Sequence, residues 1–166
     1  MKTPLLIKKR ENYIQRILPF MRKPIIKVLT GHRRVGKSYI LLQLMEQIRA
    51  EEPQANIIYI NREDMEYNFM TGAKELNDYV QSKMTNNKRN YIFIDEIQDI
   101  NQFEKALRSL LLDENNDIYI TGSNAKILSG ELATYLSGRY VEFTIYSLCY
   151  SEFLYFHNLE DSDRSP

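Results

Sequence analysis

Eight residues near the start of the chain have the types and the spacing needed to hold phosphate. Residues Gly31 to Ser38 read GHRRVGKS, which fits the pattern G-x-x-x-x-G-K-[ST] known as Walker A. Glycines let the backbone wrap an anion with its N–H groups, Lys37 adds positive charge, and the Ser38 hydroxyl suits Mg²⁺. The predicted nucleotide-binding residues are Gly31, His32, Arg33, Arg34, Val35, Gly36, Lys37, Ser38 and Tyr39.

Two adjacent carboxylates follow an apolar run later in the chain. The run YIFI, residues 91–94, is typical of a central strand covered on both faces, and Asp95 and Glu96 come directly after it. A carboxylate at the end of such a strand reaches a water of the Mg²⁺ held by Ser38, so Asp95 is the second predicted metal residue. On an extended chain Glu96 points away from Asp95, and we predict that it orients and deprotonates a water attacking the γ phosphate.

Three further polar side chains are catalytic candidates, each with a structural alternative. Ser123 and Asn124 follow the strand-like run IYIT, and one of them either senses the γ phosphate or caps the next helix. Arg139 precedes the last expected strand, where it either brings positive charge to its own or a neighbour's transition state or forms a surface salt bridge. These three residues join Glu96 and Lys37 as predicted catalytic residues.

Short apolar runs alternate with longer helix-like stretches from Ile25 to Leu154, which predicts an α/β fold with a parallel sheet and helices on both faces. Pro19 is expected to end or kink the first helix. The expected strands cover residues 25–30, 56–61, 91–94, 118–121 and 140–145. The expected helices cover about residues 11–18, 37–50, 74–84, 102–112, 125–136 and 150–157.

The length of 166 residues suits one domain, which we divide into a basic helical segment at 1–24, a core at 25–157 and a polar, frayed tail at 158–166. Residues 1–38 hold eleven of the 22 Lys and Arg residues but only one of the 22 acidic residues, Glu11. A basic segment attracts phosphate from a nucleotide, a nucleic acid or an acidic partner, or is simply a solvated helix face.

Membrane and disulfide chemistry are not predicted. No apolar stretch is long enough to span a bilayer, and no apolar signal core follows the first basic residues, so we expect a cytoplasmic protein without a membrane partner. Cys149 is the single cysteine in the sequence and has no disulfide partner within the chain. It is predicted to be a small buried or half-buried hydrophobic residue.

The motifs together resemble the N-terminal ATPase domain of a prokaryotic family in the AAA+ superfamily of P-loop NTPases. The resemblance covers residues 25–156 and rests on GHRRVGKS, YINRED, YIFIDEIQDI, TGSNAKIL, LSGRY and SEFL. It implies a three-layer sandwich with sheet order 5-1-4-3-2, ATP and Mg²⁺ as ligands, Asp95 and Glu96 as Walker B, and TGSN as sensor 1. That family continues into a helical lid and a C-terminal domain of unknown function. We therefore expect either a truncated ATPase or a protein that retains nucleotide binding without this output module.

Three functions remain open at this point. An ATPase that produces ADP and phosphate leads, and a nucleotide-binding switch or degenerate module with little turnover is the alternative. A small-molecule kinase is disfavoured because no Arg-rich insertion follows the fourth expected strand. The expected partners are ATP or ADP, with a protein partner or a second copy of the chain left open. Nucleic acid also remains open, although the basic segment lacks stacking aromatics beyond Tyr13 and Phe20.

Overall fold

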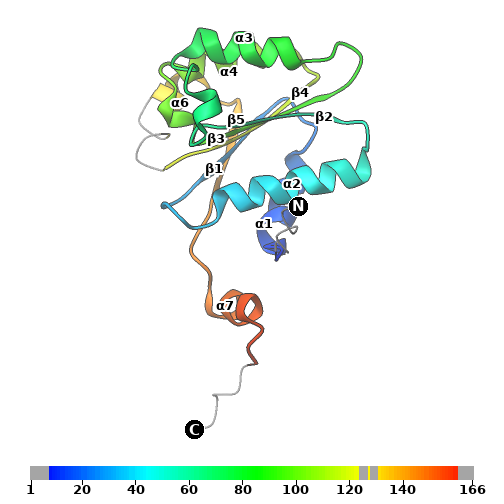
Figure 1. Ribbon diagram of the computed structural model, residues 1–166, viewed down its shortest axis with the longest axis vertical. Helices are drawn as coiled ribbons and strands as arrows, with labels where there is room; N and C mark the ends of the chain where they lie inside the picture. Colours follow the sequence, from blue (N-terminus) through cyan, green and yellow to red (C-terminus); the bar gives the residue numbers. More distant parts are fainter. Residues whose placement is uncertain (1–7, 124–126, 128–130, 161–166) are drawn as a thin grey trace.

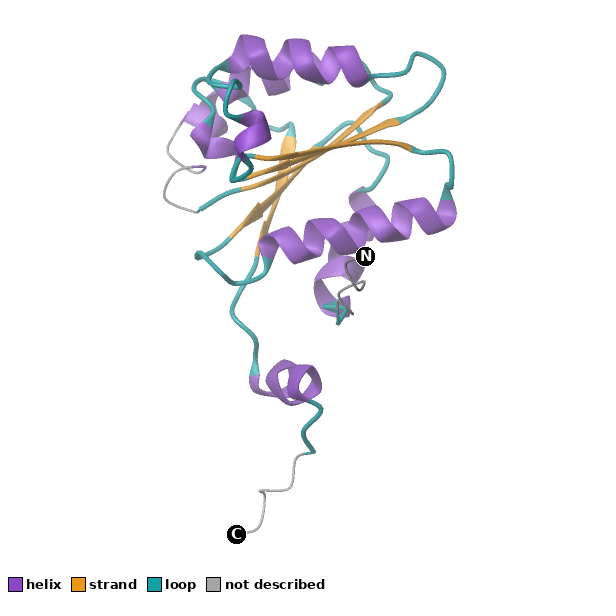
Figure 2. Cartoon of the chain, in the orientation of Figure 1, coloured by secondary structure: helices purple, strands orange, loops and turns teal. Residues whose placement is uncertain are grey.

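Five parallel strands form one sheet in the computed structural model, which describes residues 8–123, 127 and 131–160 (Figures 1 and 2). The sheet order is β2-β3-β4-β1-β5, which read from the other side is the order 5-1-4-3-2 implied by the family resemblance. The predicted α/β class and sheet order are therefore confirmed. The strands are β1 (Ile26–Thr30), β2 (Asn56–Asn61), β3 (Asn90–Asp95), β4 (Asn116–Thr121) and β5 (Tyr140–Thr144).

Helices cover both faces of the sheet. Figure 1 shows α1 and α2 on one face and α3, α4 and α6 on the other. Three short 3-10 turns also occur, at Leu18–Phe20, Met65–Tyr67 and Ile97–Asp99. The α-helices are α1 (Glu11–Ile17), α2 (Lys37–Glu51), α3 (Ala73–Lys83), α4 (Phe103–Leu110), α6 (Glu131–Tyr135) and α7 (Tyr150–His157).

The two faces of the sheet carry different side chains because successive residues of a strand point to opposite sides. In β3, Ile92 and Ile94 pack with the α3 and α4 side, whereas Tyr91 and Phe93 pack with the α1 and α2 side. Phe93 stacks on Tyr119 of β4 with ring centroids 4.5 Å apart. The run YIFI is apolar throughout because both of its faces are covered.

Helix α2 begins where the predicted phosphate loop ends and lies along the sheet through an apolar stripe. Its buried stripe consists of Ile40, Leu41, Leu44, Met45 and Ile48. Helix α1 contributes Ile14 and Ile17 to the same buried cluster, so the N-terminal helix is packed into the molecule. The α-helix ends before Pro19, which stands in the 3-10 turn that follows, as its missing N–H requires.

β3 and β4 begin one and two residues earlier than predicted, because asparagines pair across the strand starts. Asn56, Asn90 and Asn116 lie opposite one another in β2, β3 and β4. The Asn56 amide donates to the Asn90 side-chain oxygen at 2.8 Å, and the Asn90 amide donates to that of Asn116 at 3.1 Å. These polar residues join the sheet because their amides satisfy one another.

The chain leaves the sheet after β5, which overturns the prediction for Cys149. This cysteine is exposed at the start of α7, a helix without any buried residue, and so it packs in no core. Of the helix expected at 125–136, the structure describes residue 127, α6 and Leu136, which follows α6, while residues 125, 126 and 128–130 lie outside the described residues. Among residues 8–123, 127 and 131–160, no helix is both long and apolar enough to cross a membrane.

Candidate nucleotide-binding site

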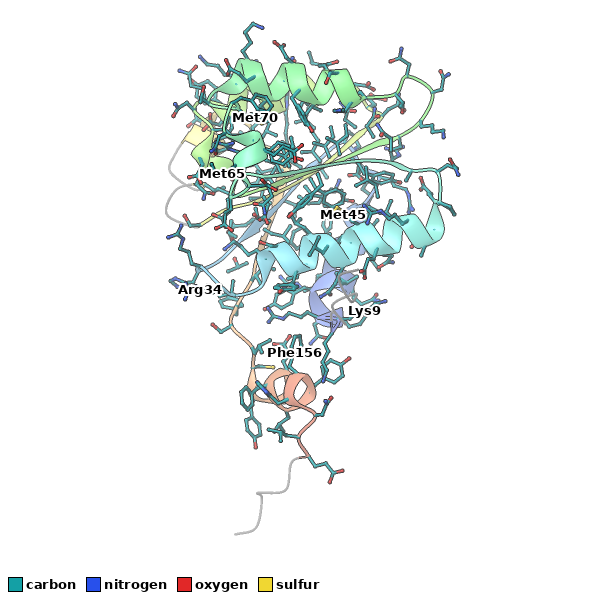
Figure 3. The ribbon with its side chains drawn as sticks, in the orientation of Figure 1. Lys9, Arg34, Met45, Met65, Met70 and Phe156 are labelled. Carbon is teal, nitrogen blue, oxygen red and sulfur yellow. The ribbon has the colours of Figure 1, made fainter. Side chains whose placement is uncertain are left out.

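Most of the predicted functional residues, but not Arg139, gather at the carboxyl ends of the central strands. The loop between β1 and α2 follows Thr30, Asp95 ends β3 and Thr121 ends β4. Figure 3 labels Arg34 on this loop, away from the sheet. A cavity of about 770 Å³ opens here, lined by Arg33, Arg34, Gly36, Lys37, Ser38, Tyr39, Glu63 and Glu96.

The backbone of the loop requires its glycines. Gly31 has φ +144°, and a Cβ on it would lie 2.3 Å from the carbonyl oxygen of Ile145. Gly36 has φ +95°, a left-handed conformation that side chains disfavour. Arg34 is also left-handed, with φ 64°. The loop therefore holds a backbone shape that suits wrapping an anion.

Lys37 is nearly buried but lacks a close ionic partner. Its side chain is 4% exposed and its Nζ donates to the carbonyl oxygens of Gly31 and His32 at 3.1 and 2.9 Å. Among the described residues, the nearest carboxylate oxygen is Oε1 of Glu96, 3.9 Å away. A buried ammonium is costly unless it is paired, so this position suits an arriving anion.

Asp95 is held by hydroxyl groups on the neighbouring strands. It is 2% exposed and accepts hydrogen bonds from Thr121 Oγ1 and, at 3.4 Å, from the Tyr59 hydroxyl. Burial, and next the Asp95 charge, raises the pKa of Tyr59 well above its ordinary value, so this hydroxyl keeps its proton and remains a donor. Neither Thr121 nor Tyr59 was predicted from the sequence as a site residue. The position of Thr121 at the end of a strand, just before the candidate Ser123, could have indicated it.

Glu96 does not continue the extended strand, contrary to the prediction. It adopts a left-handed conformation, φ 57° and ψ 48°, and begins the 3-10 turn Ile97–Asp99. Its N–H donates to Thr121 Oγ1 at 3.0 Å, while the Gln98 amide donates to its Oε2. The chain turns because Thr121 supplies a side-chain acceptor to the Glu96 N–H, and the carboxylate comes near Lys37. Gln98 was also missed from the sequence.

Ser123 lies at the carboxyl end of β4, half-buried and close in sequence to Thr121. Its carbonyl oxygen accepts the Ile127 N–H at 3.1 Å, as expected at the start of a helix. Asn124 lies outside the described residues. The sensor role of either residue stays a prediction.

Arg139 lies at the opposite end of the sheet from the loop. It is exposed, and its carbonyl accepts the Ile26 N–H at 2.9 Å, next to the first residue of β1. The loop follows the last residue of β1, five residues further on, which at about 3.3 Å per residue is roughly 16 Å away. A role for Arg139 at its own site does not fit this position, because a strand length separates the two ends.

The other predicted binding residues differ in whether they contribute a side chain at the cavity or a main-chain carbonyl oxygen. Arg33, Arg34 and Tyr39 are exposed and line the cavity. Val35 is buried, and its carbonyl oxygen accepts a hydrogen bond from Arg10 at 2.8 Å. The contribution of His32 is likewise its carbonyl, which accepts from Lys37. These two residues thus act through main-chain oxygens, and Arg10 is a neighbour of the loop that sequence reasoning missed.

The polar groups of the site fit Mg²⁺ only in company with phosphate. Within the described residues, no three His, Cys, Asp or Glu side chains gather to hold a metal. Mg²⁺ binds through one or two protein oxygens together with waters and substrate phosphates. The half-buried hydroxyl of Ser38, which forms no hydrogen bond to the described part of the chain, and the Asp95 carboxylate supply that kind of donor set.

Two relatives match most of this chain in sequence. An uncharacterized protein of Haemophilus influenzae is 43% identical over 157 residues, covering 93% of this chain and 39% of that protein. One of Methanocaldococcus jannaschii is 37% identical over 139 residues, covering 84% and 30%. This chain thus spans less than half the length of either relative.

A solved structure shares the fold at low sequence identity. The DNA polymerase III gamma subunit-related protein of Thermotoga maritima superposes with a TM-score of 0.63 at 15% identity, covering 93% of this chain and 51% of that one. Residues 23–154 match the AAA domain family. With its parallel sheet of order 5-1-4-3-2 and its glycine loop before α2, this chain belongs to the AAA domain family of P-loop NTPases.

Proposed function

We propose that this chain binds Mg·ATP at the loop Gly31–Ser38 and hydrolyses it to ADP and phosphate. The observation that carries the proposal is the state of Lys37. Its ammonium is nearly buried beside a cavity, bonded to two loop carbonyls, with the Glu96 carboxylate 3.9 Å away. A cation for phosphate and a base for water are thereby close together at one cavity.

The phosphates would be held by the loop N–H groups, by Lys37 and by the positive N-terminal end of the long helix α2. Ser38 and Asp95 would hold Mg²⁺, which when bound would neutralise charge on the nucleotide phosphates. Thr121 and Tyr59 keep the Asp95 side chain in place by donating to its oxygens. The loop thus binds the nucleotide while the strand ends orient the metal ligand.

Glu96 is the proposed general base. As the water oxygen forms its bond to the γ phosphorus, Glu96 accepts a proton, and the bond from the γ phosphorus to the β–γ bridging oxygen breaks. ADP leaves with that electron pair. The hydrogen bonds from the Glu96 N–H to Thr121 and from Gln98 to the carboxylate fix the base before substrate binds.

The test compares Glu96→Gln with wild type in two assays on the purified chain. Removing the base should lower the ATP turnover rate at least about 100-fold, while ATP affinity by calorimetry stays within about threefold. Glu66→Gln, at an exposed position outside the cavity, is the matched control and should keep both values. Equal turnover in Glu96→Gln and wild type would refute the role of Glu96, and absence of ATP binding in wild type would refute the function.

A nucleotide switch with little turnover is the second candidate, and the position of Arg139 favours it. Among the cavity-lining residues the cations are Arg33, Arg34 and Lys37, while Arg139 is a strand length away. Arg139 would then serve a transition state only in a second copy of the chain.

If a second copy supplies Arg139, ATP turnover per chain should rise with protein concentration and should fall in Arg139→Ala. If the chain is instead a switch, it should bind ATP without turnover at every protein concentration.

A further inference from the structure

Helix α7 stands apart from the sandwich and is held to it by polar contacts. Figures 1 and 2 show the chain leaving β5 and reaching α7 well below the sheet. In Figure 3, Phe156 marks this helix and Lys9 the N-terminal segment nearer the sandwich. The Lys8 ammonium donates to the carbonyl oxygen of Tyr155 and to the Asn158 side chain. The N-terminal segment therefore provides much of the attachment of α7.

Arg10 is the centre of this attachment. Its side chain is 3% exposed, and its Nε and Nη2 donate to the two carboxylate oxygens of Glu152 in α7, each at 2.9 Å. The Arg10 guanidinium lowers the pKa of Glu152, so the pair is ionised at neutral pH. A bidentate pair between a buried guanidinium and a half-buried carboxylate is geometrically specific, unlike an exposed surface ion pair.

The same guanidinium also holds the phosphate loop. Arg10 Nη1 donates to the carbonyl oxygen of Val35 at 2.8 Å and to that of Tyr146, in the segment leading to α7, at 3.0 Å. Its backbone N–H donates to the Gln43 side chain on α2 at 3.0 Å. One buried side chain thus contacts the loop, the connection from β5 and α7 together.

The bond to Val35 fixes a peptide unit that leads into Gly36, which lines the cavity. Within one planar trans peptide the C=O and the next N–H point in opposite directions. Arg10 holds the Val35 carbonyl, so the Gly36 N–H is directed to the other side of the same peptide, and Gly36 lines the cavity. Loss of Arg10 would free this peptide to rotate, since Gly36 has no side chain to restrain it.

We propose that Arg10 is a positioning residue that couples the phosphate loop to α7, so that the docking of α7 and the binding of nucleotide strengthen each other. The proposal rests on the proposed function for its ligand. Binding couplings are reciprocal, so the factor by which docked α7 tightens nucleotide binding equals the factor by which nucleotide tightens docking. The helix exposes Tyr150, Phe153 and Tyr155, so nucleotide would control the position of an aromatic surface.

The experiment measures amide hydrogen exchange in the full chain, separately for peptides covering residues 31–38 and 150–157. Glu152→Gln removes the carboxylate that holds the Arg10 guanidinium, without altering the loop itself. Without nucleotide, we expect exchange in 31–38 to rise at least about threefold, although residue 152 is far from the loop in sequence. Arg10→Lys should give the same increase, because one ammonium cannot replace the planar fork that reaches both Glu152 and Val35.

A second arm adds Mg·ATP. In wild type, nucleotide should slow exchange in 150–157, and in Glu152→Gln this response should disappear while ATP affinity falls at least about fivefold. Glu160→Gln, exposed beyond the end of α7, is the matched control and should behave as wild type in both arms. If Arg10 has only a structural role, the variants should change the amide exchange of 150–157, but Mg·ATP should not alter that exchange in wild type or in the variants.

The outcomes separate the two proposals. If Glu152→Gln loosens 150–157 but leaves 31–38 unchanged without nucleotide, Arg10 only docks α7 and the coupling is refuted. If wild type binds Mg·ATP but 150–157 does not respond, the coupling is refuted while the proposed function stands. If wild type does not bind nucleotide, the proposed function fails, and the nucleotide-free arm still decides whether Arg10 links α7 to the loop.

Discussion

At the amino ends of the strands Lys27 and Asp117 are both fully buried and paired, whereas at the carboxyl ends Lys37 is almost as buried but its Nζ lies 3.9 Å from the Glu96 carboxylate. We call these regions the amino edge, centred on Lys27, Asp117 and Tyr91, and the carboxyl edge, centred on Lys37, Asp95 and Glu96. Both place a lysine in the interior. They differ in whether the chain itself completes the hydrogen bonding.

The amino edge satisfies its polar groups internally. Asp117 pairs with Lys27 and accepts hydrogen bonds from the Arg22 N–H at 2.7 Å and the Tyr119 hydroxyl at 2.8 Å. The Tyr91 hydroxyl donates to Glu52 at 2.8 Å. Burial lowers the pKa of Lys27 and Asp117 opposes that effect, so the pair is needed to keep the ammonium charged. Such a network specifies the packing of β1 against β4.

The carboxyl edge leaves part of its bonding capacity for a ligand. Lys37 is bonded to carbonyls, and the Ser38 hydroxyl forms no hydrogen bond to the described residues. The proposed nucleotide site would lower stability in exchange for binding, because its charges would be fully paired only with the nucleotide present. Substitutions at the amino edge should therefore lower the free energy of unfolding, whereas substitutions at the carboxyl edge should lower ATP affinity.

Asp117→Ala should have the largest effect on stability. The change leaves the Lys27 ammonium buried without its carboxylate, which costs about 3–5 kcal/mol of the free energy of unfolding. Urea denaturation followed by circular dichroism measures the loss. Asp78→Ala is the control, because its pair with Lys74 is exposed to solvent and contributes little to stability. A loss at Asp117 no larger than at Asp78 would contradict the assignment of the amino edge.

Lys37→Met should show the reverse pattern. ATP affinity by calorimetry should fall at least about 100-fold, equivalent to about 2.7 kcal/mol, while the free energy of unfolding stays constant within about 1 kcal/mol or rises. The reason is that methionine removes a buried charge that lacks a close ionic partner. Lys74→Met, on an exposed face, should change neither quantity appreciably. Strong destabilisation by Lys37→Met would erase the distinction between the edges.

Tyr91→Phe should have the smallest effect, and it appears only at high pH. Burial, and next the bond to Glu52, raises the pKa of Tyr91 to about 12 from 10.0. A raised pKa means that the folded state holds the Tyr91 proton more tightly than the unfolded state does. The contribution of this hydroxyl to the free energy of unfolding is therefore full below pH 10 and is lost as pH rises through 12.

Between pH 10 and pH 12 we expect the free energy of unfolding to fall by about 1 kcal/mol more in wild type than in Tyr91→Phe. This difference is modest because Glu52 and Arg22, beside the hydroxyl, are partly exposed. Urea denaturation at each pH measures the difference, and titration of the other groups is common to both proteins. Parallel stability curves for the two proteins would show that Tyr91 does not couple the amino edge to pH.

Local patterns were sufficient to predict the glycine-containing loop, the helix after it and the central strands. Gly36 and Lys37 stand at a fixed spacing between an apolar run and an amphipathic helix, and every part of that signal lies within a short stretch of sequence. The sheet order came from family resemblance, because periodicity does not encode which strands are neighbours. Asp95 was placed correctly at the end of its strand, since a strand ends where its apolar run ends.

The errors arose where a distant residue overrides a local pattern. Glu96 was expected to continue an extended chain, but Thr121 on the next strand bonds its N–H and the chain turns. Cys149 was expected in a core on the basis of residue type, but the chain has already left the sheet there. Arg139 was considered for its own site, but the parallel pairing of β5 with β1 places it at the amino edge.

The sequence by itself determined that this protein has a glycine-containing loop before a helix and a carboxylate at the end of a central strand, because those groups are specified by short motifs and by the ends of apolar strands. Only the tertiary structure decided which side chains support them. Arg10, Gln98 and Thr121 contact the loop or Glu96 from other elements, and Lys27 meets Asp117 across two strands. Burial makes these distant pairings necessary, because each polar group removed from water must find its partner wherever the fold brings one.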